Sequence, residues 1–201
     1  MSKALDMARE LVKQLEEAEK ANKVQLSELK PGEVFKIGKH DFIVLEHDIR
    51  NHTTKVISKN FMAKNAVFDE DTRDYNKSNL KKVIENEIQP IIEAEFGANN
   101  LVEHTVDLTS VDMQHEFEPC TCKVRPITFD EARQYNNLLV NEELNDCWWT
   151  CTPWSTAERS WAYAIAVVHS SGDFYNYNYD VFNGVRPVCI LKSNIFVSRG
   201  E

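Results

Sequence analysis

The stretch DFYNYNYDVFNGVRPV, residues 173–188, decides how the C-terminal third of this 201-residue chain is interpreted. Aromatic residues alternate with asparagines in its first half, and a mainly apolar segment follows the glycine at position 184. Because tyrosine and phenylalanine favour strands whereas asparagine and aspartate favour turns, an edge hairpin explains this composition by propensity alone. Binding loops use the same residues, since tyrosine supplies contact area and asparagine supplies adaptable hydrogen bonds. We therefore expect a binding surface mounted on a sheet, followed by a buried strand.

Side chains in a strand alternate between its two faces. A strand that begins at Phe174 would place the three tyrosines on one face and the asparagines, followed by Asp180, on the other. One of these faces must be outside. The predicted ligand-binding residues are Trp148, Trp154, Tyr175, Asn176, Tyr177, Asn178, Tyr179 and Asp180.

Four tryptophans lie just before this stretch, at positions 148, 149, 154 and 161. A pleated strand sends alternate side chains inward, so we expect Trp149 and Trp161 in the core and Trp148 and Trp154 at the surface. Arg186 is flanked by apolar strand residues. We interpret it as a structural arginine that pairs with a buried carboxylate or with carbonyl groups.

The N-terminal segment, residues 1–24, predicts a separate amphipathic helix from Ser2 to about Asn22. Its apolar positions recur at helical spacing and are Leu5, Ala8, Val12, Leu15 and Ala18. About three heptads are too few for an independent coiled coil, so the helix either packs on the domain or joins a homo-oligomer. We favour the homo-oligomer. Residues 22–29 are interpreted as a linker before the turn at Lys30-Pro31-Gly32.

The remaining segment, residues 25–201, is expected to contain short strands and two or three helices. A hairpin is expected from Glu33 to about Glu46, and residues 56–58 continue its sheet. A helix from about Ser78 is expected to bend or split at Pro90 and to end at Gly97. Further expected elements are a short strand within residues 101–110, a helix opened by the capping box at residues 128–131, and a run of strands after residue 146.

The motifs of this domain, taken in order, resemble one known family. They are LKPGEVFKIGKHDFIVLE, KVISKN, YNKSNLKKVIENE, VDLTS, ITFDEA, WWTCTPWS, a valine strand ending in SSGD, and NGVRPVCIL. Their order from about Gln25 to Val197 is similar to a domain of unknown function found in Firmicute bacteria and their phages. That family closes with a pattern close to WWLRSPG and then GVRPALWL. Cys151 stands where the family has an arginine, so no role of that arginine is carried over.

The closing pattern also resembles the formylglycine-generating-enzyme version of the C-type-lectin fold, in which a Gly-Phe-Arg-like motif forms a late central strand. Gly184-Val185-Arg186 occupies the matching place. Variable proteins made by diversity-generating retroelements use this fold to display a changeable surface just before that strand. The resemblance thus implies a mixed α+β domain of the C-type-lectin-like fold, built from short, twisted antiparallel strands, with a ligand face between Trp148 and Asn183. The residues of that face are either fixed or varied by a diversity-generating retroelement.

The net charge of −9 is concentrated in residues 66–118, which contain thirteen acidic and four basic residues. Direct nucleic-acid binding is disfavoured, because phosphate neutralisation needs a basic stripe. Such an acidic segment is either a solvated face or a surface for a basic protein. The chain has no long apolar stretch and no signal-peptide pattern, so we expect no membrane insertion and synthesis in a bacterial cytoplasm.

Cysteines and carboxylates suggest two metal sites, neither with the usual spacing. Five cysteines without a secretory signal indicate reduced thiols. Cys-x-Cys and Cys-x-x-x-Cys are not the usual zinc spacings, and the acidic loop lacks the glycine and closing glutamate of an EF-hand. The candidate ligands are His115, Cys120, Cys122, Cys147 and Cys151 for zinc, and Asp69, Asp71 and Asp74 for calcium. We predict no metal and no cofactor.

These observations favour a non-enzymatic binding module, associated with a phage, whose partner is a host protein or a glycan. Two alternatives stay open. One is a phage-encoded inhibitor that binds a basic host protein through the acidic segment. The other is a cysteine-dependent oxidase-like enzyme that uses Cys147 and Cys151, although no basic residue in a recognisable motif would lower the pKa of either thiol. The binding module is compatible both with a virion component and with an intracellular protein.

Overall fold

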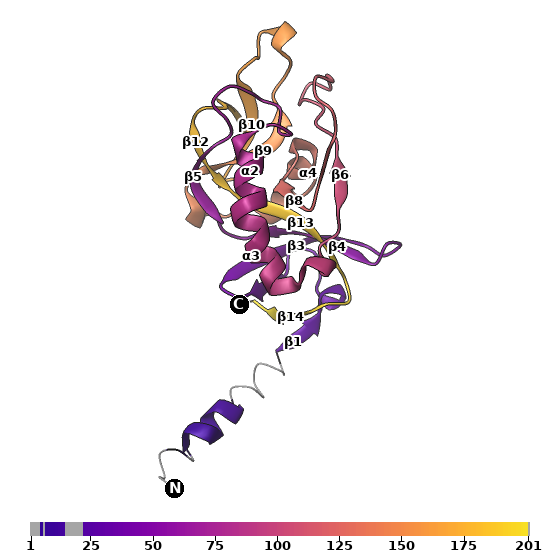
Figure 1. Ribbon diagram of the computed structural model, residues 1–201, viewed down its shortest axis with the longest axis vertical. Coiled ribbons are helices and arrows are strands. Elements are labelled where there is room, and N and C mark those ends of the chain that lie inside the picture. Colours follow the sequence, from indigo (N-terminus) through magenta and orange to yellow (C-terminus); the bar gives the residue numbers. More distant parts are fainter. Residues whose placement is uncertain (1–4, 6, 15–21, 201) are drawn as a thin grey trace.

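The computed structural model describes residue 5, residues 7–14 and residues 22–200, and within these bounds the protein is an α+β fold built mainly from antiparallel strands (Figure 1). The strands are β1 (Lys23–Gln25), β2 (Val34–Ile37), β3 (His40–Asp48), β4 (Thr53–Ser58), β5 (Ala63–Val67), β6 (His104–Val106), β7 (Cys120–Cys122), β8 (Val124–Pro126), β9 (Cys147–Pro153), β10 (Ala164–His169), β11 (Phe174–Asn178), β12 (Phe182–Val185), β13 (Pro187–Lys192) and β14 (Phe196–Arg199). The helices are α2 (Asn79–Val83), α3 (Gln89–Phe96), α4 (Phe129–Gln134) and α5 (Asn136–Leu139), with a π-helical turn over Ile84–Ile88 and short 3₁₀ turns elsewhere. The expected α+β class is confirmed.

Three sheets organise these strands. A seven-stranded sheet has the order β1-β14-β2-β3-β4-β13-β8, a five-stranded sheet has the order β11-β10-β9-β12-β5, and β6 pairs with β7. The strand pairs are antiparallel except β12 with β9, which run parallel at Gly184 and Trp148. The predicted hairpin is confirmed as β2 and β3, and β4 continues its sheet as expected.

Two cores join the sheets to the helices. The larger core combines side chains of both large sheets with one face of the helical rod at residues 79–96, and Figure 1 shows this rod running past both sheets. The smaller core lies under α4 and α5, where Ala132 and Leu139 pack with Trp148 and Val168 of the five-stranded sheet. The five-stranded sheet therefore has buried side chains on both of its faces.

The helical rod follows the predicted signals. Ser78 caps its N-terminus by accepting a hydrogen bond from the Lys81 amide (3.1 Å). A π-helical turn ends at Ile88, two residues before Pro90, whose missing N–H interrupts the regular helical pattern. Gly97 ends the rod with φ of 83°, a positive value that glycine adopts without a steric penalty. The expected end at Gly97 is confirmed, whereas the helix is not split at Pro90.

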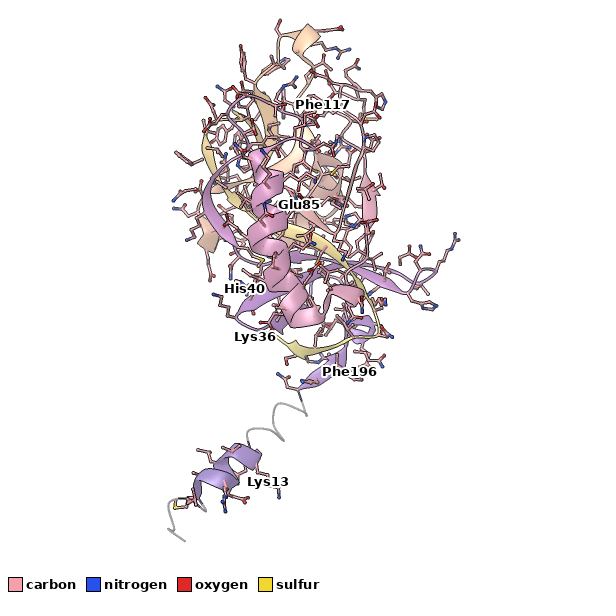
Figure 2. All side chains as sticks on the ribbon, in the orientation of Figure 1. Lys13, Lys36, His40, Glu85, Phe117 and Phe196 are labelled. Carbon is pink, nitrogen blue, oxygen red and sulfur yellow. The ribbon has the colours of Figure 1, made fainter. Side chains whose placement is uncertain are left out.

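The segment expected to be a linker is part of the fold. Strand β1 pairs with β14, and Leu26 and Leu29 are buried in the larger core. The linker prediction was wrong because it rested on polar composition alone, whereas two leucines in this segment fill the core. Before β1, every described side chain of residue 5 and residues 7–14 is exposed, and Lys13 lies in this helical segment, apart from the sheets (Figure 2). Leu15 and Ala18 of the predicted apolar stripe lie outside the described residues.

The chain crosses between the two large sheets at Arg186, which separates β12 from β13. Just before it, Gly184 lies against the ring of Phe61, so closely that a Cβ atom at this position would meet the ring at 2.5 Å. The glycine is therefore required by close packing. Within the described part of the chain, no helix is both long enough and apolar enough to cross a membrane.

Candidate functional site

Strand β11 is one of the two edge strands of the five-stranded sheet, and among the described residues it pairs only with β10. Tyr175 lies opposite Val167 and Tyr177 lies opposite Ile165, both of which are buried in the larger core. Residues opposite each other in a sheet point to the same face. The two tyrosines thus project beside the larger core, and they remain 46% and 42% exposed because no strand beyond β11 covers them within the described residues.

Contacts orient both tyrosine rings. The ring of Tyr175 meets the imidazole of His169 edge-on, with centroids 6.2 Å apart, and Tyr177 Oη lies 3.9 Å from Cys147 Sγ. Asn178, the last residue of β11, is exposed, and alternation along the strand places it on the opposite face, with Asn176. We call Tyr175 and Tyr177 the aromatic edge. It presents two oriented phenol groups on a rigid strand.

The opposite face of β11 is packed under α4. Phe174 meets the ring of Phe129 at 5.0 Å, and Asn176 on the same face is half-buried. Trp154 is half-buried as well, with its ring 6.4 Å from Phe129 and 6.3 Å from the exposed Trp161. The predicted residues Trp154 and Asn176 therefore belong to a different face from the aromatic edge.

Tyr179 lies beyond the end of β11 and is anchored. Its amide donates to the Tyr163 carbonyl (2.9 Å), the two rings are 5.9 Å apart, and its own carbonyl accepts from the amide of Phe68 (2.9 Å). The side chain packs partly against the larger core. Only two of the three tyrosines thus belong to the aromatic edge, while Asp180 is exposed in the turn that follows.

Two tryptophan predictions were wrong. Trp148 is fully buried in the smaller core, although its pleat position suggested the surface, because β9 lies inside a sheet that is covered on both faces. Trp161 is 42% exposed, because it lies in the loop after a 3₁₀ turn and not in a strand. Trp149 is buried as expected.

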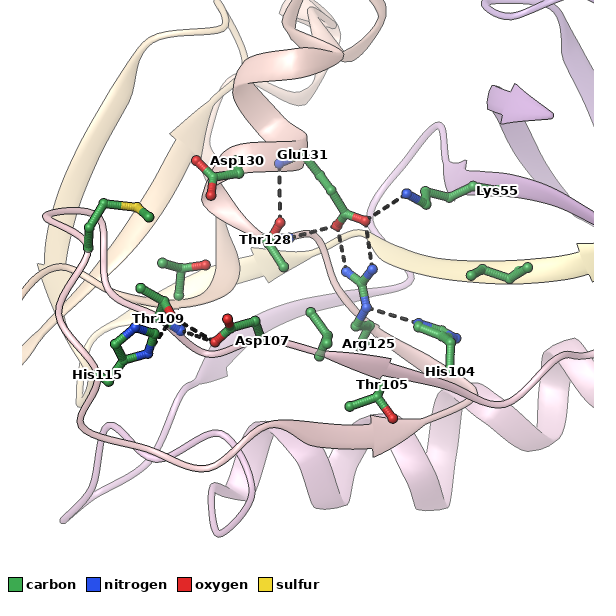
Figure 3. A pocket seen from close by; sticks show the side chains of 14 residues that line it. Lys55, His104, Thr105, Asp107, Thr109, His115, Arg125, Thr128, Asp130 and Glu131 are labelled. Atoms are coloured by element: carbon green, nitrogen blue, oxygen red, sulfur yellow. Dashed lines mark hydrogen bonds and ion pairs between the residues drawn. The ribbon is translucent and has the colours of Figure 1, made fainter. Parts of the chain in front are cut away.

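A pocket of about 370 Å³, which we call the polar pocket, opens where β4, β6, β8 and α4 approach each other (Figure 3). Glu131 lies at its floor and binds Arg125 with two hydrogen bonds of 2.7 Å. The same carboxylate accepts from Lys55 Nζ (3.0 Å) and from the Thr128 amide (3.1 Å). Burial alone would raise the pKa of Glu131, but the hydrogen bonds and charge of Arg125, together with Lys55, hold this pKa well below its ordinary value. The charged groups at the floor of the pocket therefore already have ion-pair partners.

His104 is fixed in one tautomer by this network. Arg125 Nε donates to His104 Nε2 (3.0 Å), so Nε2 must be an acceptor, and Nδ1 donates to the Val102 carbonyl (3.2 Å). Burial, with the nearby charge of Arg125, lowers the pKa of His104. This imidazole is neutral with both nitrogens occupied, so it is not a free base in this arrangement.

The carboxylates at the rim of the polar pocket can accept further hydrogen bonds. Thr109 donates its amide (2.9 Å) and its hydroxyl (2.7 Å) to Oδ1 of Asp107, and its oxygen also meets His115 Nδ1 (2.9 Å). Asp130 contacts Arg133 at 3.6 Å and is largely exposed. Of these residues, the sequence indicated the capping pair Thr128 and Glu131, and it indicated His115 as a candidate zinc ligand. Lys55, His104 and Arg125 come from separate strands, and no local motif joins them.

The geometry gives little support to the candidate metal sites and to the cysteine-dependent enzyme. All five cysteines are buried and free, and no three metal-ligating side chains gather at one point within the described residues. Burial raises the pKa of Cys147, and it raises the pKa of Cys151 to about 12. In the acidic loop, Asp69 accepts from the backbone amides of Asp71, Thr72 and Asn79, as a turn-forming residue does.

Comparison with known proteins gives no relative: no family model, no curated protein and no solved structure matches this chain.

Proposed function

We propose that this protein is a non-enzymatic binding module that holds a partner on the aromatic edge. The observation that carries this proposal is the exposure of Tyr175 and Tyr177 on one face of an outer strand of a sheet whose inner strands are mostly buried. Tyrosine side chains on a rigid support give a large contact area at a small entropy cost. An outer strand also offers unpaired backbone groups to an added strand.

The contact surface includes neighbours on both sides of the aromatic edge. Asp180 and Asn178 supply hydrogen-bonding groups at its end, and Tyr163 adds a further exposed ring. Across β11, the exposed Trp161 and the half-buried Trp154 and Asn176 form a second set that a large partner would also reach. The predicted residue Trp148 is excluded because it is buried.

The finer fold assignment, a C-type-lectin-like domain, is part of the same proposal. It is supported by the predominance of short antiparallel strands and by the place of Gly184-Val185-Arg186 between the two large sheets. Association with a phage, synthesis in a bacterial host and a host protein or glycan as partner follow from the sequence resemblance. Enzymatic cysteine chemistry is less favoured, because the thiolate is the reactive form and burial raises the pKa of Cys147 and Cys151.

The proposal is tested by a pull-down from bacterial lysate and envelope fractions with the wild type and a Tyr175→Ala/Tyr177→Ala variant. The variant should lose the captured partner while its thermal melt stays close to that of the wild type, since both side chains are far from fully buried. Phe196→Ala is the matched control, because Phe196 is an exposed aromatic residue on β14 of the other large sheet.

Treating the fractions with protease or with periodate separates a protein partner from a glycan. Equal capture by the wild type and the double variant would contradict the proposal. So would a double variant that melts far below the wild type, because the tyrosines would then serve the fold.

A further inference from the structure

The polar pocket has a chemistry that differs from that of the aromatic edge. Its floor contains two cations, Lys55 and Arg125, and the carboxylate of Glu131, which binds both of them. Lys55 Nζ also lies 3.0 Å from Glu46, which is outside the pocket lining. Every charged group of the floor already has a partner of opposite sign. The charge that a ligand would meet is therefore set by the rim and not by the floor.

The rim is acidic. Asp107 uses Oδ1 for both bonds from Thr109, and Oδ2 has no hydrogen-bond partner within the described residues. Asp130 has only the long contact to Arg133, and its side chain is 74% exposed. Both carboxylates line the pocket, and in Figure 3 Thr109 and His115 lie next to Asp107, whereas Asp130 lies nearer to Thr128. These two anionic groups favour a cation and disfavour an anionic ligand.

The lining of the pocket also includes apolar side chains. Val106, Met113 and Ile190 line the pocket together with threonine side chains that carry methyl groups. Met113 is a flexible thioether with 67% exposure, and such a side chain adapts to a flexible aliphatic chain. A lysine or arginine matches this combination, since its methylene stem packs on apolar surface while its head meets a carboxylate.

We infer that the polar pocket binds the cationic side chain of a lysine or arginine residue on a protein partner. The volume of about 370 Å³ fits one such side chain and lies near the lower end of the range for small-ligand pockets. Residues 66–118, which supply Asp107, carry the net negative charge of the chain and steer a basic surface toward this opening. This inference does not depend on the aromatic edge.

The test is a titration followed by amide NMR shifts, with Nα-acetyl-L-arginine methylamide, its lysine counterpart and the uncharged citrulline derivative as probes. The arginine or the lysine derivative should give saturable shifts for residues 104–109 and 128–131. The citrulline derivative should give none, because it keeps the shape of arginine without the charge. Raising the ionic strength from about 0.05 M to about 0.3 M should weaken binding, as expected for a solvent-accessible ion pair.

Asp130→Asn should weaken binding of the cationic probe about fivefold, the upper range for one exposed ion pair. This substitution leaves the capping box of Thr128 and Glu131 unchanged, since the Asp130 side chain takes no part in it. Glu118→Gln is the matched control, because Glu118 is an exposed carboxylate that does not line the pocket.

The Tyr175→Ala/Tyr177→Ala variant should bind the cationic probe like the wild type, so a failure of the aromatic-edge proposal would be visible separately. Equal affinity for the citrulline derivative, unchanged affinity in Asp130→Asn, or no saturable shift with either cationic probe would overturn the inference.

Discussion

The guanidinium of Arg186 lies over the indole ring of Trp148, with 4.5 Å between the guanidinium carbon and the ring centroid. Both side chains are fully buried. Arg186 donates to the carbonyl oxygens of Ser58 (3.0 Å) and Leu139 (2.8 Å), so it ties the sheet crossing to β4 and to the end of α5. The sequence predicted a structural arginine paired with a carboxylate or with carbonyl groups, and the carbonyl version is confirmed.

Replacing Arg186 with methionine should destabilise the protein by about 3 kcal/mol, because two buried carbonyl groups lose their donors. Urea unfolding at neutral pH measures this change. Arg133→Met is the matched control: Arg133 also lies over an aromatic ring, that of Phe129, but it is exposed, so its loss should cost less than about 0.5 kcal/mol. Equal effects of the two substitutions would show that burial of Arg186 contributes nothing.

Gly184→Ala should destabilise the protein by about 1–3 kcal/mol, since the added methyl group would overlap the Phe61 ring. Combining it with Phe61→Ala should remove most of the additional cost, because the ring that it strikes is then gone. A double-mutant cycle from thermal melts measures this coupling. Strictly additive effects would argue against the close packing of these two residues.

The ion pairs of Glu131 predict a specific dependence of stability on pH. Its pKa is lower in the folded protein than in the unfolded chain, so its stabilising effect is complete above the unfolded pKa and is lost as pH falls toward the folded value. Glu131→Gln should therefore be less stable than the wild type at neutral pH. The difference between the two should shrink as the pH falls below the unfolded value of about 4.5.

Urea unfolding of both proteins at several pH values gives this comparison. Glu118→Gln should show no such convergence with the wild type, since Glu118 is exposed and lies outside the network. A constant difference between the wild type and Glu131→Gln at all pH values would contradict the prediction.

The N-terminal helix should mediate self-association, because Leu5, Leu11 and Val12 are exposed on it. Removing residues 1–22 should convert an oligomer into a monomer, as measured by light scattering coupled to gel filtration. The cut belongs before Lys23, since β1 and Leu26 are part of the fold. The Leu5→Lys/Val12→Lys variant of the full chain should also be a monomer. A wild-type protein that is itself monomeric would contradict the prediction.

Local signals explain most of what could be predicted. The hairpin of β2 and β3, the cap at Ser78, the end of the rod at Gly97 and the capping box at Thr128 each depend on a few consecutive residues. Such signals act through backbone conformation and hydrogen bonds within one or two turns. They can therefore be recognised without knowledge of the rest of the chain. The alternation of Tyr175 and Tyr177 on one face of β11 is of the same kind.

The amino-acid sequence by itself determined the α+β class, the boundaries of the main helices and the strand character of the tyrosine tract. Only the tertiary structure decided which side chains are covered. Trp148 is buried and Trp161 is exposed because helix α4 and two sheets enclose β9, whereas a loop carries Trp161 outward. The polar pocket likewise exists only because β4, β6, β8 and α4 bring Lys55, His104, Arg125 and Glu131 together. Burial and long-range ion pairs depend on packing between segments that are distant in the chain, and no local pattern encodes them.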